Sequence, residues 1–162
     1  MTDDAFFRDF GTRWEAAWNS HETDRVLELT HPDIHWNDTV FWPQEIDGHA
    51  ALRGYIDTIW QVMPDVEFEE VQLFTAPADG RALYLFQQTA TAPPKFGTDQ
   101  RAVTYGCDIF LGFTDGLLSN YLAQYEISDM MRQYGALPPR DGRVGGQYLL
   151  SLLGRGDWRE RR

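Results

Sequence analysis

Two aspartates in apolar surroundings are the residues of this chain that best fit acid–base chemistry. Asp108 is the only charged residue in AVTYGCDIFLGF, residues 102–113, a run that is apolar on both faces of the strand it predicts. In HPDIHWNDTV an extended chain places Asp38 on the same face as Ile34 and Trp36. A buried carboxylate is costly unless it is hydrogen-bonded, paired or protonated, and such acids are enriched at functional sites.

Two buried acids in one pocket suit proton transfer, with one carboxylate ionised as a base and the other kept neutral as a hydrogen-bond donor. Each aspartate also has a purely structural interpretation. Asn37, Asp38 and Thr39 have the residue types of an ordinary turn. Asp108 can be a structural carboxylate that accepts a hydrogen bond from a Tyr or Trp side chain. The sequence leaves these alternatives open.

Other motifs predict no metal and no cofactor. His31 and His35 have a spacing found in metal sites, but Pro32 between them disfavours the helix that would bring them together. The single cysteine, Cys107, points to the opposite face of the strand from Asp108 and excludes an intramolecular disulfide. The chain carries no phosphate-binding loop and no dinucleotide fingerprint. We therefore expect chemistry that uses side chains alone.

Helices are predicted in the first part of the chain, where they must position these acids. Thr2 or Asp3 can cap a helix whose apolar residues recur every three or four positions: Phe6, Phe7, Phe10, Trp14, Ala17 and Trp18. A short second helix is predicted for residues 23–29. A third helix begins near Gly48, ends before Pro64, and has one apolar stripe: Leu52, Tyr55, Ile56, Ile59, Trp60 and Met63.

Strands are predicted in the second part, where the apolar period changes to two. They cover residues 66–76, 81–92, 102–114 and 117–127, which predicts an antiparallel meander. A short helix follows, capped by Ser128 and Asp129 and closed by Gly135. Helices followed by a run of strands indicate the α+β class, with a curved antiparallel sheet whose concave face is closed by the helices. Such a shape leaves a pocket.

Composition narrows the class of protein and its partners. The chain has 162 residues, including 23 aromatic ones, which suits one domain with a large apolar interior or an aromatic-lined cavity. A formal net charge of −11 argues against nucleic acid and anionic membrane surfaces as partners. No apolar run is long enough to span a membrane, so we expect a cytoplasmic protein. Residues 1–137 form the acidic domain, and residues 138–162 form a basic extension with a partly helical pattern.

Three stretches carry a resemblance to a known family: TRWEAAWNSHETDRVLELTHPDIHWND, DGHAALRGYIDTIWQVMPDVEF and TYGCDIFLGFTDGLLSNYLAQYEISDMMRQYG. Over residues 5–137 the chain resembles the nuclear-transport-factor-two-like superfamily, in particular its SnoaL-like polyketide cyclase and ketosteroid isomerase branches. The resemblance implies a cone-shaped barrel of a curved antiparallel sheet closed by N-terminal helices. It also implies a homodimer.

By position, the resemblance places the general base of ketosteroid isomerase on Asp38 and its protonated oxyanion-hole aspartate on Asp108. Trp14 stands where the isomerase has an oxyanion-hole tyrosine, which argues against steroid isomerisation. Gln88 can bind a carbonyl or hydroxyl where SnoaL-type pockets have a histidine. The epoxide hydrolase branch needs an arginine between two aspartates, whereas Arg81 and Arg101 lie at strand ends.

The predicted function is that of a cofactor-independent enzyme, an isomerase or cyclase, that abstracts a proton next to a carbonyl of a mostly apolar small molecule. Asp38 and Asp108 are the predicted catalytic residues. The predicted substrate-binding residues are Trp14, Trp18, Trp36, Trp42, Tyr55, Phe86, Gln88, Phe110, Tyr121 and Tyr125. Core packing is the alternative for each aromatic residue. A non-catalytic ligand-binding or dimeric interaction protein and an epoxide hydrolase are the alternative functions.

Overall fold

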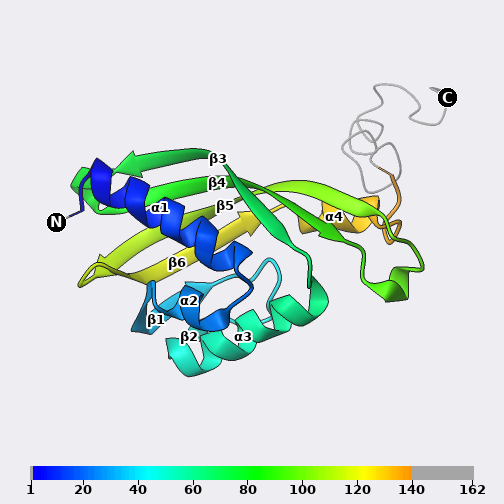
Figure 1. The fold of residues 1–162 in the computed structure, drawn as a ribbon, viewed down its shortest axis with the longest axis horizontal. Helices are drawn as coiled ribbons and strands as arrows, with labels where there is room; N and C mark the ends of the chain where they lie inside the picture. Colours follow the sequence, from blue (N-terminus) through cyan, green and yellow to red (C-terminus); the bar gives the residue numbers. More distant parts are fainter. Residues whose placement is uncertain (1, 140–162) are drawn as a thin grey trace, which may run out of the picture.

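Six strands and four α-helices make up the part of the chain that the computed structural model describes, residues 2–139 (Figure 1). The helices are α1 (Asp4–Asn19), α2 (Thr23–Leu27), α3 (Gly48–Val62) and α4 (Ile127–Gln133), with short 3-10 turns at Pro77–Asp79 and Pro94–Phe96. The strands are β1 (Thr30–Asn37), β2 (Ile46–Asp47), β3 (Glu67–Ala76), β4 (Arg81–Thr91), β5 (Arg101–Thr114) and β6 (Leu117–Tyr125). The predicted basic extension lies, from residue 140 onward, outside the described residues.

All six strands belong to one sheet, in the order β2-β1-β6-β5-β4-β3. Strands β3 to β6 form the predicted antiparallel meander, because each pairs with the next along the chain. Strand β1 departs from the prediction, since it runs parallel to β6. The order leaves β2 and β3 unpaired on their outer sides, so the sheet curves without closing into a barrel. The predicted α+β class, with a curved sheet covered by N-terminal helices, is confirmed, and β1 pairs with β6 in parallel rather than antiparallel.

Helix α1 lies across one face of the sheet, and α2 and α3 lie beside the β1 and β2 end (Figure 1). As predicted, the carboxylate of Asp3 caps α1 by accepting a hydrogen bond from the backbone N–H of Phe6, at 2.8 Å. The apolar side of the helix is buried against the sheet, and the buried Gly11 faces the side chain of Leu73. The side of α1 that the sequence predicts to be apolar is therefore the side that packs against the sheet.

Two helix ends differ slightly from the prediction. Helix α2 ends at Leu27 rather than Leu29, and β1 begins three residues later. The N-cap of α4 is Glu126 rather than Ser128, because the helix begins directly after β6. Gly135 closes α4 as predicted, with a positive φ of 79° that a glycine adopts without strain. Among residues 2–139, no helix is both long enough and apolar enough to cross a lipid bilayer.

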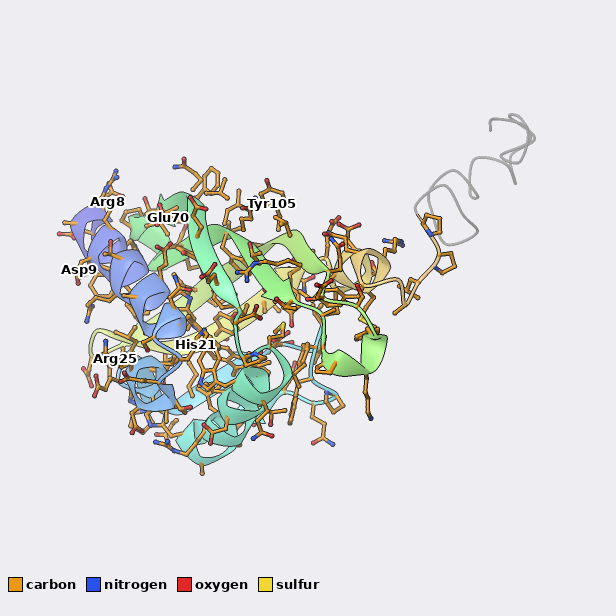
Figure 2. All side chains as sticks on the ribbon, turned by 45° about the vertical axis from the view of Figure 1, so that its right-hand side comes forward. Arg8, Asp9, His21, Arg25, Glu70 and Tyr105 are labelled. Atoms are coloured by element: carbon orange, nitrogen blue, oxygen red, sulfur yellow. The ribbon has the colours of Figure 1, made fainter. Side chains whose placement is uncertain are left out.

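The two faces of the sheet are covered differently. The inward face of β4 is buried under α1, with Tyr84 and Phe86 at 1% and 2% exposure. The outward face carries large apolar side chains that no described helix covers, and Phe74 and Tyr105 remain 55% and 52% exposed. Figure 2 shows Tyr105 directed away from the sheet. The core, and any enclosed site, therefore lie between the sheet and α1.

Candidate active site

A cavity lies between the concave face of the sheet, α1 and α3, with an empty volume of about 580 Å³ that includes open solvent at its mouth. Its wall is mostly aromatic and aliphatic, with three carboxyl groups and one carboxamide. The lining residues are Trp14, Glu15, Trp18, Trp36, Asp38, Phe41, Tyr55, Ile59, Met63, Phe68, Tyr84, Phe86, Gln88, Asp108, Tyr121, Tyr125, Ile127 and Met130. Apolar cavities with a few converging polar groups are the usual form of small-molecule sites.

Asp108 lies in the middle of β5, where neighbouring strands pair on both sides and direct its side chain into the cavity. The indole N–H of Trp14 donates a hydrogen bond to its Oδ2 at 2.7 Å, and the hydroxyl of Tyr121 donates to its Oδ1 at 2.5 Å. Burial raises the pKa of Asp108 from 3.8 to about 7, although both hydrogen bonds act to lower it. Burial therefore brings the pKa of this carboxyl close to neutral pH.

Asp38 directly follows β1 and is 2% exposed. The hydroxyl of Tyr55 donates to its Oδ2, and the hydroxyl of Tyr125 lies 3.0 Å from both carboxylate oxygens. The backbone N–H of Phe41 donates to Oδ1 at 3.3 Å, and the backbone carbonyl of Asp38 accepts from Phe41 and Trp42. Asp38 thus takes part in a turn and also faces the cavity, so both sequence interpretations describe its surroundings. Burial raises its pKa, against the effect of these hydrogen bonds.

The two carboxyl groups influence each other electrostatically. The negative charge of Asp38 is one of the causes that raise the pKa of Asp108. Burial raises the pKa of Tyr55 and Tyr121 far above 10, so these hydroxyls stay protonated and act as donors. Because two charges in one apolar cavity repel each other, the favoured state has one carboxylate ionised and one neutral. In this state the ionised carboxylate can accept a proton from a ligand, and the neutral carboxyl can supply one.

The structure places both predicted acids and eight of the ten predicted binding residues in the wall of this one cavity. These eight are Trp14, Trp18, Trp36, Tyr55, Phe86, Gln88, Tyr121 and Tyr125. They come from α1, α3 and strands β1, β4 and β6. The ring of Trp36, on β1, stacks on the ring of Tyr121 with centroids 3.6 Å apart. The hydroxyl of Tyr121 is one of the hydrogen-bond donors of Asp108. The predicted residues are therefore brought together spatially.

Two predicted binding residues lie elsewhere. Trp42 packs edge-on against Tyr55, with ring centroids 5.5 Å apart, and its neighbour Phe41 lines the cavity instead. In the turn after β1, consecutive side chains point in different directions, and the amino-acid sequence of the turn does not indicate which of them faces the cavity. Phe110 is completely buried beside Phe10 and Trp14, with ring centroids 5.1 and 5.3 Å away. It faces the same side of β5 as Asp108, but beyond the end of the cavity.

Several lining residues had not been predicted, and Glu15 is the most informative. Its Oε2 accepts hydrogen bonds from the hydroxyl of Tyr84 and from the backbone N–H of Glu70, both at 2.6 Å. Glu15 borders the apolar face of α1, so the helical pattern alone does not separate it from a solvated glutamate. The others are Tyr84 and the apolar residues Phe41, Ile59, Met63, Phe68, Ile127 and Met130. The spacing of three between the two α4 residues was the signal available for that helix.

The two histidines with metal-like spacing lie on the exposed face of β1. The Nδ1 of His35 lies 2.9 Å from Asp47, and the Nδ1 of His31 accepts a hydrogen bond from the backbone N–H of Asp33. Residues 2–139 contain no group of three or more His, Cys, Asp or Glu side chains arranged to hold a metal ion. Cys107 is half-buried and lies on the outer face of β5.

The fold and the cavity define a small α+β domain whose single curved sheet encloses an apolar, acid-containing pocket. Residues 12–121 match the family model described as SnoaL-like domain, which spans more than half of the chain, and the protein belongs to this family. The resemblance found in the sequence is thereby confirmed. No curated protein sequence matches the chain.

Solved structures with the same fold have low sequence identity to this chain. AclR, a candidate hydroxylase from Streptomyces galilaeus, is 19% identical with a TM-score of 0.71, and the match covers 92% of this chain and 95% of AclR. A candidate polyketide cyclase from Bacillus cereus is 13% identical with a TM-score of 0.66, covering 82% and 83%. TerC, co-crystallised with polyporic acid, is 11% identical with a TM-score of 0.67, covering 80% and 98%. These likenesses establish the fold.

Proposed function

We propose that the protein is a cofactor-independent acid–base enzyme of the isomerase or cyclase type. It removes a proton next to a carbonyl group of a mostly apolar small molecule and returns a proton at another position. The observation that carries this proposal is the pair of buried carboxyl groups, Asp38 and Asp108, in the wall of one aromatic cavity. Burial raises the pKa of both groups, which brings them toward the range where general acids and bases work at neutral pH.

In this mechanism Asp38 is the base and Asp108 is the acid. The charge of Asp38 favours the neutral form of Asp108, whose pKa is raised to about 7. Ionised Asp38 takes the proton from the carbon next to the carbonyl, while the neutral carboxyl of Asp108 donates a hydrogen bond to the developing enolate oxygen. Protonated Asp38 then returns its proton to another atom of the enolate. Where the enolate carbon instead attacks a second carbonyl and closes a ring, Asp38 gives the proton to the alkoxide oxygen formed there.

The comparisons support the choice of ligand class. One of the structural neighbours is a candidate polyketide cyclase, and another was co-crystallised with a small molecule, polyporic acid. Within residues 2–139 no Lys or Arg side chain lines the cavity. Arg101 forms ion pairs with Asp65 and Glu67 outside it. An epoxide hydrolase with an arginine between two aspartates is therefore not favoured by this geometry.

Exchange of carbon-bound hydrogen tests the proposal directly. With 2-tetralone in deuterated buffer, we expect the protein to accelerate deuterium incorporation next to the carbonyl, measured by proton NMR. Asp38→Asn should abolish most of this acceleration, whereas Asp33→Asn, which changes an exposed acid in the preceding strand β1, should leave it unchanged. Unchanged exchange in both Asp38→Asn and Asp108→Asn would contradict the mechanism. Binding of the ketone without any exchange would favour the non-catalytic alternative, and labelled water in a diol product the hydrolase.

We also infer that two copies associate through the outer face of the sheet. Phe74, Leu83, Ile109 and Leu122 form one row across β3 to β6, each in register with the next. Helix α1 covers the opposite face (Figure 1), so this row has no cover within the described residues. Light scattering should give twice the chain mass, and Phe74→Glu should reduce it to the monomer mass. A monomeric wild-type protein would contradict the inference.

A further inference from the structure

One buried carboxamide in the cavity wall, that of Gln88, forms no hydrogen bond with any residue in the range 2–139. Gln88 is 4% exposed and follows Tyr84 and Phe86 on the inward face of β4. A carboxamide has an oxygen that accepts and an NH₂ group that donates, and buried polar groups are almost always paired with protein or ordered water. Gln88 therefore marks a place in the cavity where a polar partner is expected.

The neighbours of Gln88 in the sheet do not supply this partner. On one side Gln88 is in register with the apolar Phe68, and on the other with Thr104. Side chains paired across two strands have Cβ atoms about 5 Å apart, so Gln88 and Thr104 are within reach of each other and yet do not bond. Within residues 2–139 the enclosed and unpaired side-chain atoms include the Oγ1 of Thr104 but no atom of Gln88. The unpaired carboxamide is thus open to the cavity that Gln88 lines.

Gln88 is also distant from the acid Asp108 along the sheet. Tyr84 is in register with Asp108, and Gln88 lies four residues further along the same strand, which is about 13 Å. The register of β4 to β6 places Tyr125, a hydrogen-bond donor to Asp38, between these two levels. A substrate whose carbonyl is held between the two acids can therefore reach Gln88 only with a group at its opposite end.

The chemistry of the wall restricts what this group can be. Three carboxyl groups line the cavity and no cationic side chain of residues 2–139 does, so a carboxylate is repelled. An ammonium group can donate to the oxygen of Gln88 but offers no acceptor to its NH₂ group, and a single hydroxyl pairs with only one of the two at a time. A primary amide or a lactam has a C=O and an N–H side by side, so it can pair with both in one plane.

We propose that Gln88 binds an amide group, either a primary amide or a lactam, at the end of the substrate remote from the reacting carbonyl. This inference rests on the proposed function, because it names the substrate class of the same cavity. The substrate is an elongated neutral molecule with a ketone at one end and an amide at the other. Gln88 is then a specificity-determining residue that takes no part in proton transfer.

Three derivatives of 2-tetralone test the inference, each with a substituent at position 6, across the rings from the carbonyl. The substituents are a carboxamide, an isopropenyl group of the same shape that forms no hydrogen bonds, and a hydroxyl. Gln88→Met keeps the length of the side chain and removes both polar atoms. Gln87→Met is the matched control, because the carboxamide of Gln87 lies on the other face of β4 and donates to the hydroxyl of Tyr105 at 3.0 Å.

Dissociation constants from isothermal titration calorimetry give the first readout. Gln88→Met should reduce the preference for the 6-carboxamide over the 6-isopropenyl compound by about five- to a hundredfold, the usual worth of two neutral hydrogen bonds. Taking the ratio of the two constants cancels changes in packing that affect both compounds. Gln87→Met should leave the ratio unchanged. The 6-hydroxy compound should lose less affinity than the 6-carboxamide in Gln88→Met, because it forms one hydrogen bond fewer.

The side-chain amide signals of the unmodified protein give a second readout. In protein labelled with ¹⁵N-glutamine, the 6-carboxamide should move an N–H proton signal of Gln88 downfield, and the 6-isopropenyl compound should not. The signals of Gln87 are the internal control. Gln88→Met identifies the Gln88 signals by their loss, and the remaining glutamine signals show whether the variant is folded.

Three results would overturn the inference. The first is an unchanged ratio in Gln88→Met, which would mean that Gln88 holds only water. The second is binding of the 6-carboxamide without movement of the Gln88 signals. The third is an equal loss of affinity for the 6-hydroxy compound, which would exclude an amide as the recognised group.

The outcome is separable from that of the proposed function. Asp38→Asn should keep the preference for the 6-carboxamide while losing hydrogen exchange. If the preference depends on Gln88 but neither aspartate variant affects exchange, the acid–base mechanism is wrong and the assignment of Gln88 stands. If exchange depends on Asp38 but the preference does not depend on Gln88, only the present inference is wrong.

Discussion

Asp38 and Asp108 share one cavity, but different parts of the fold hold them. Asp108 is fixed in the middle of β5, and its donors come from α1 and β6. Asp38 lies just beyond β1, and one of its donors is the backbone N–H of Phe41 in the following turn. The sheet therefore determines the surroundings of one acid and a turn determines those of the other. A site built in this way lets the two groups differ in protonation although both are buried.

The largest expected difference between the two acids is in catalysis. Asp38→Asn should slow hydrogen exchange by about 10² to 10⁴-fold, because an amide has no basic lone pair for the substrate proton. Asp108→Asn should slow it by only about tenfold, because the amide keeps an N–H that can donate to the oxygen. The rates are measured by NMR with 2-tetralone. Equal losses in the two variants would show that the assigned roles do not differ.

The pH dependence of stability should separate the acids next. The folded protein holds the Asp108 proton up to a pKa of about 7, whereas the unfolded chain releases it near 3.8. Between these two values the folded state therefore binds more protons than the unfolded chain. The contribution of Asp108 to the free energy of unfolding then falls by a few kcal/mol as the pH rises from about 4 to about 7. Urea unfolding across this range should show the fall.

The raised pKa of Asp38 has the same sign, so its contribution also falls with rising pH. Because the comparison is made between variants, other titrating groups cancel. Asp108→Asn should flatten the pH dependence more than Asp38→Asn does. A wild-type slope retained in Asp108→Asn would mean that this carboxyl is ionised throughout.

A substitution at Gly106, on the strand that carries Asp108, should displace a hydrogen-bond donor of Asp38. A Cβ at Gly106 would lie 2.6 Å from both Phe86 and the Cβ of Tyr125, and Tyr125 donates to Asp38. Gly106→Ala should therefore lower the free energy of unfolding by about 1 to 3 kcal/mol through overpacking. Gly112→Ala on the same strand is the control, because its nearest neighbours are 3.6 Å away. Equal stability of the two variants would contradict the tight packing.

The smallest expected effects come from single tyrosine donors. Tyr121→Phe removes a hydrogen bond that lowers the pKa of Asp108, so that pKa should rise further. Tyr125→Phe should do the same for Asp38. Each variant should lose about 1 kcal/mol of stability. Carboxyl ¹³C titration by NMR should show each substitution acting on its own aspartate, and a shift of both by the same amount would mean that the two sites titrate as one.

Local pattern was enough to predict most of the fold. The boundaries of α1, α3 and the four-strand meander follow from apolar periods that depend only on backbone geometry. Burial of both aspartates follows from the same rule, because alternate residues of a strand face one side. The pairing of β1 with β6 was not predictable in this way, since parallel partners more than 80 residues apart leave no local signal.

The site was predicted less completely than the fold. Trp42 and Phe110 were placed in the cavity by residue type and strand face, but a turn and the length of the cavity decided otherwise. Glu15 was missed because its partner Tyr84 lies 69 positions away in the sequence. Residue type indicates what a side chain can do, whereas its neighbours decide whether it does so.

The sequence by itself determined that two carboxyl groups, Asp38 and Asp108, stand on apolar faces of an α+β domain rich in aromatic residues. This is a property of the backbone period and needs no tertiary contact. Only the tertiary structure decided that both acids enter one cavity and that each accepts hydrogen bonds from two aromatic side chains. It also decided that the indole N–H groups of Trp18 and Trp36 have no acceptor among the described residues. Convergence of side chains from α1, α3 and distant strands depends on the curvature and order of the sheet, which no local pattern encodes.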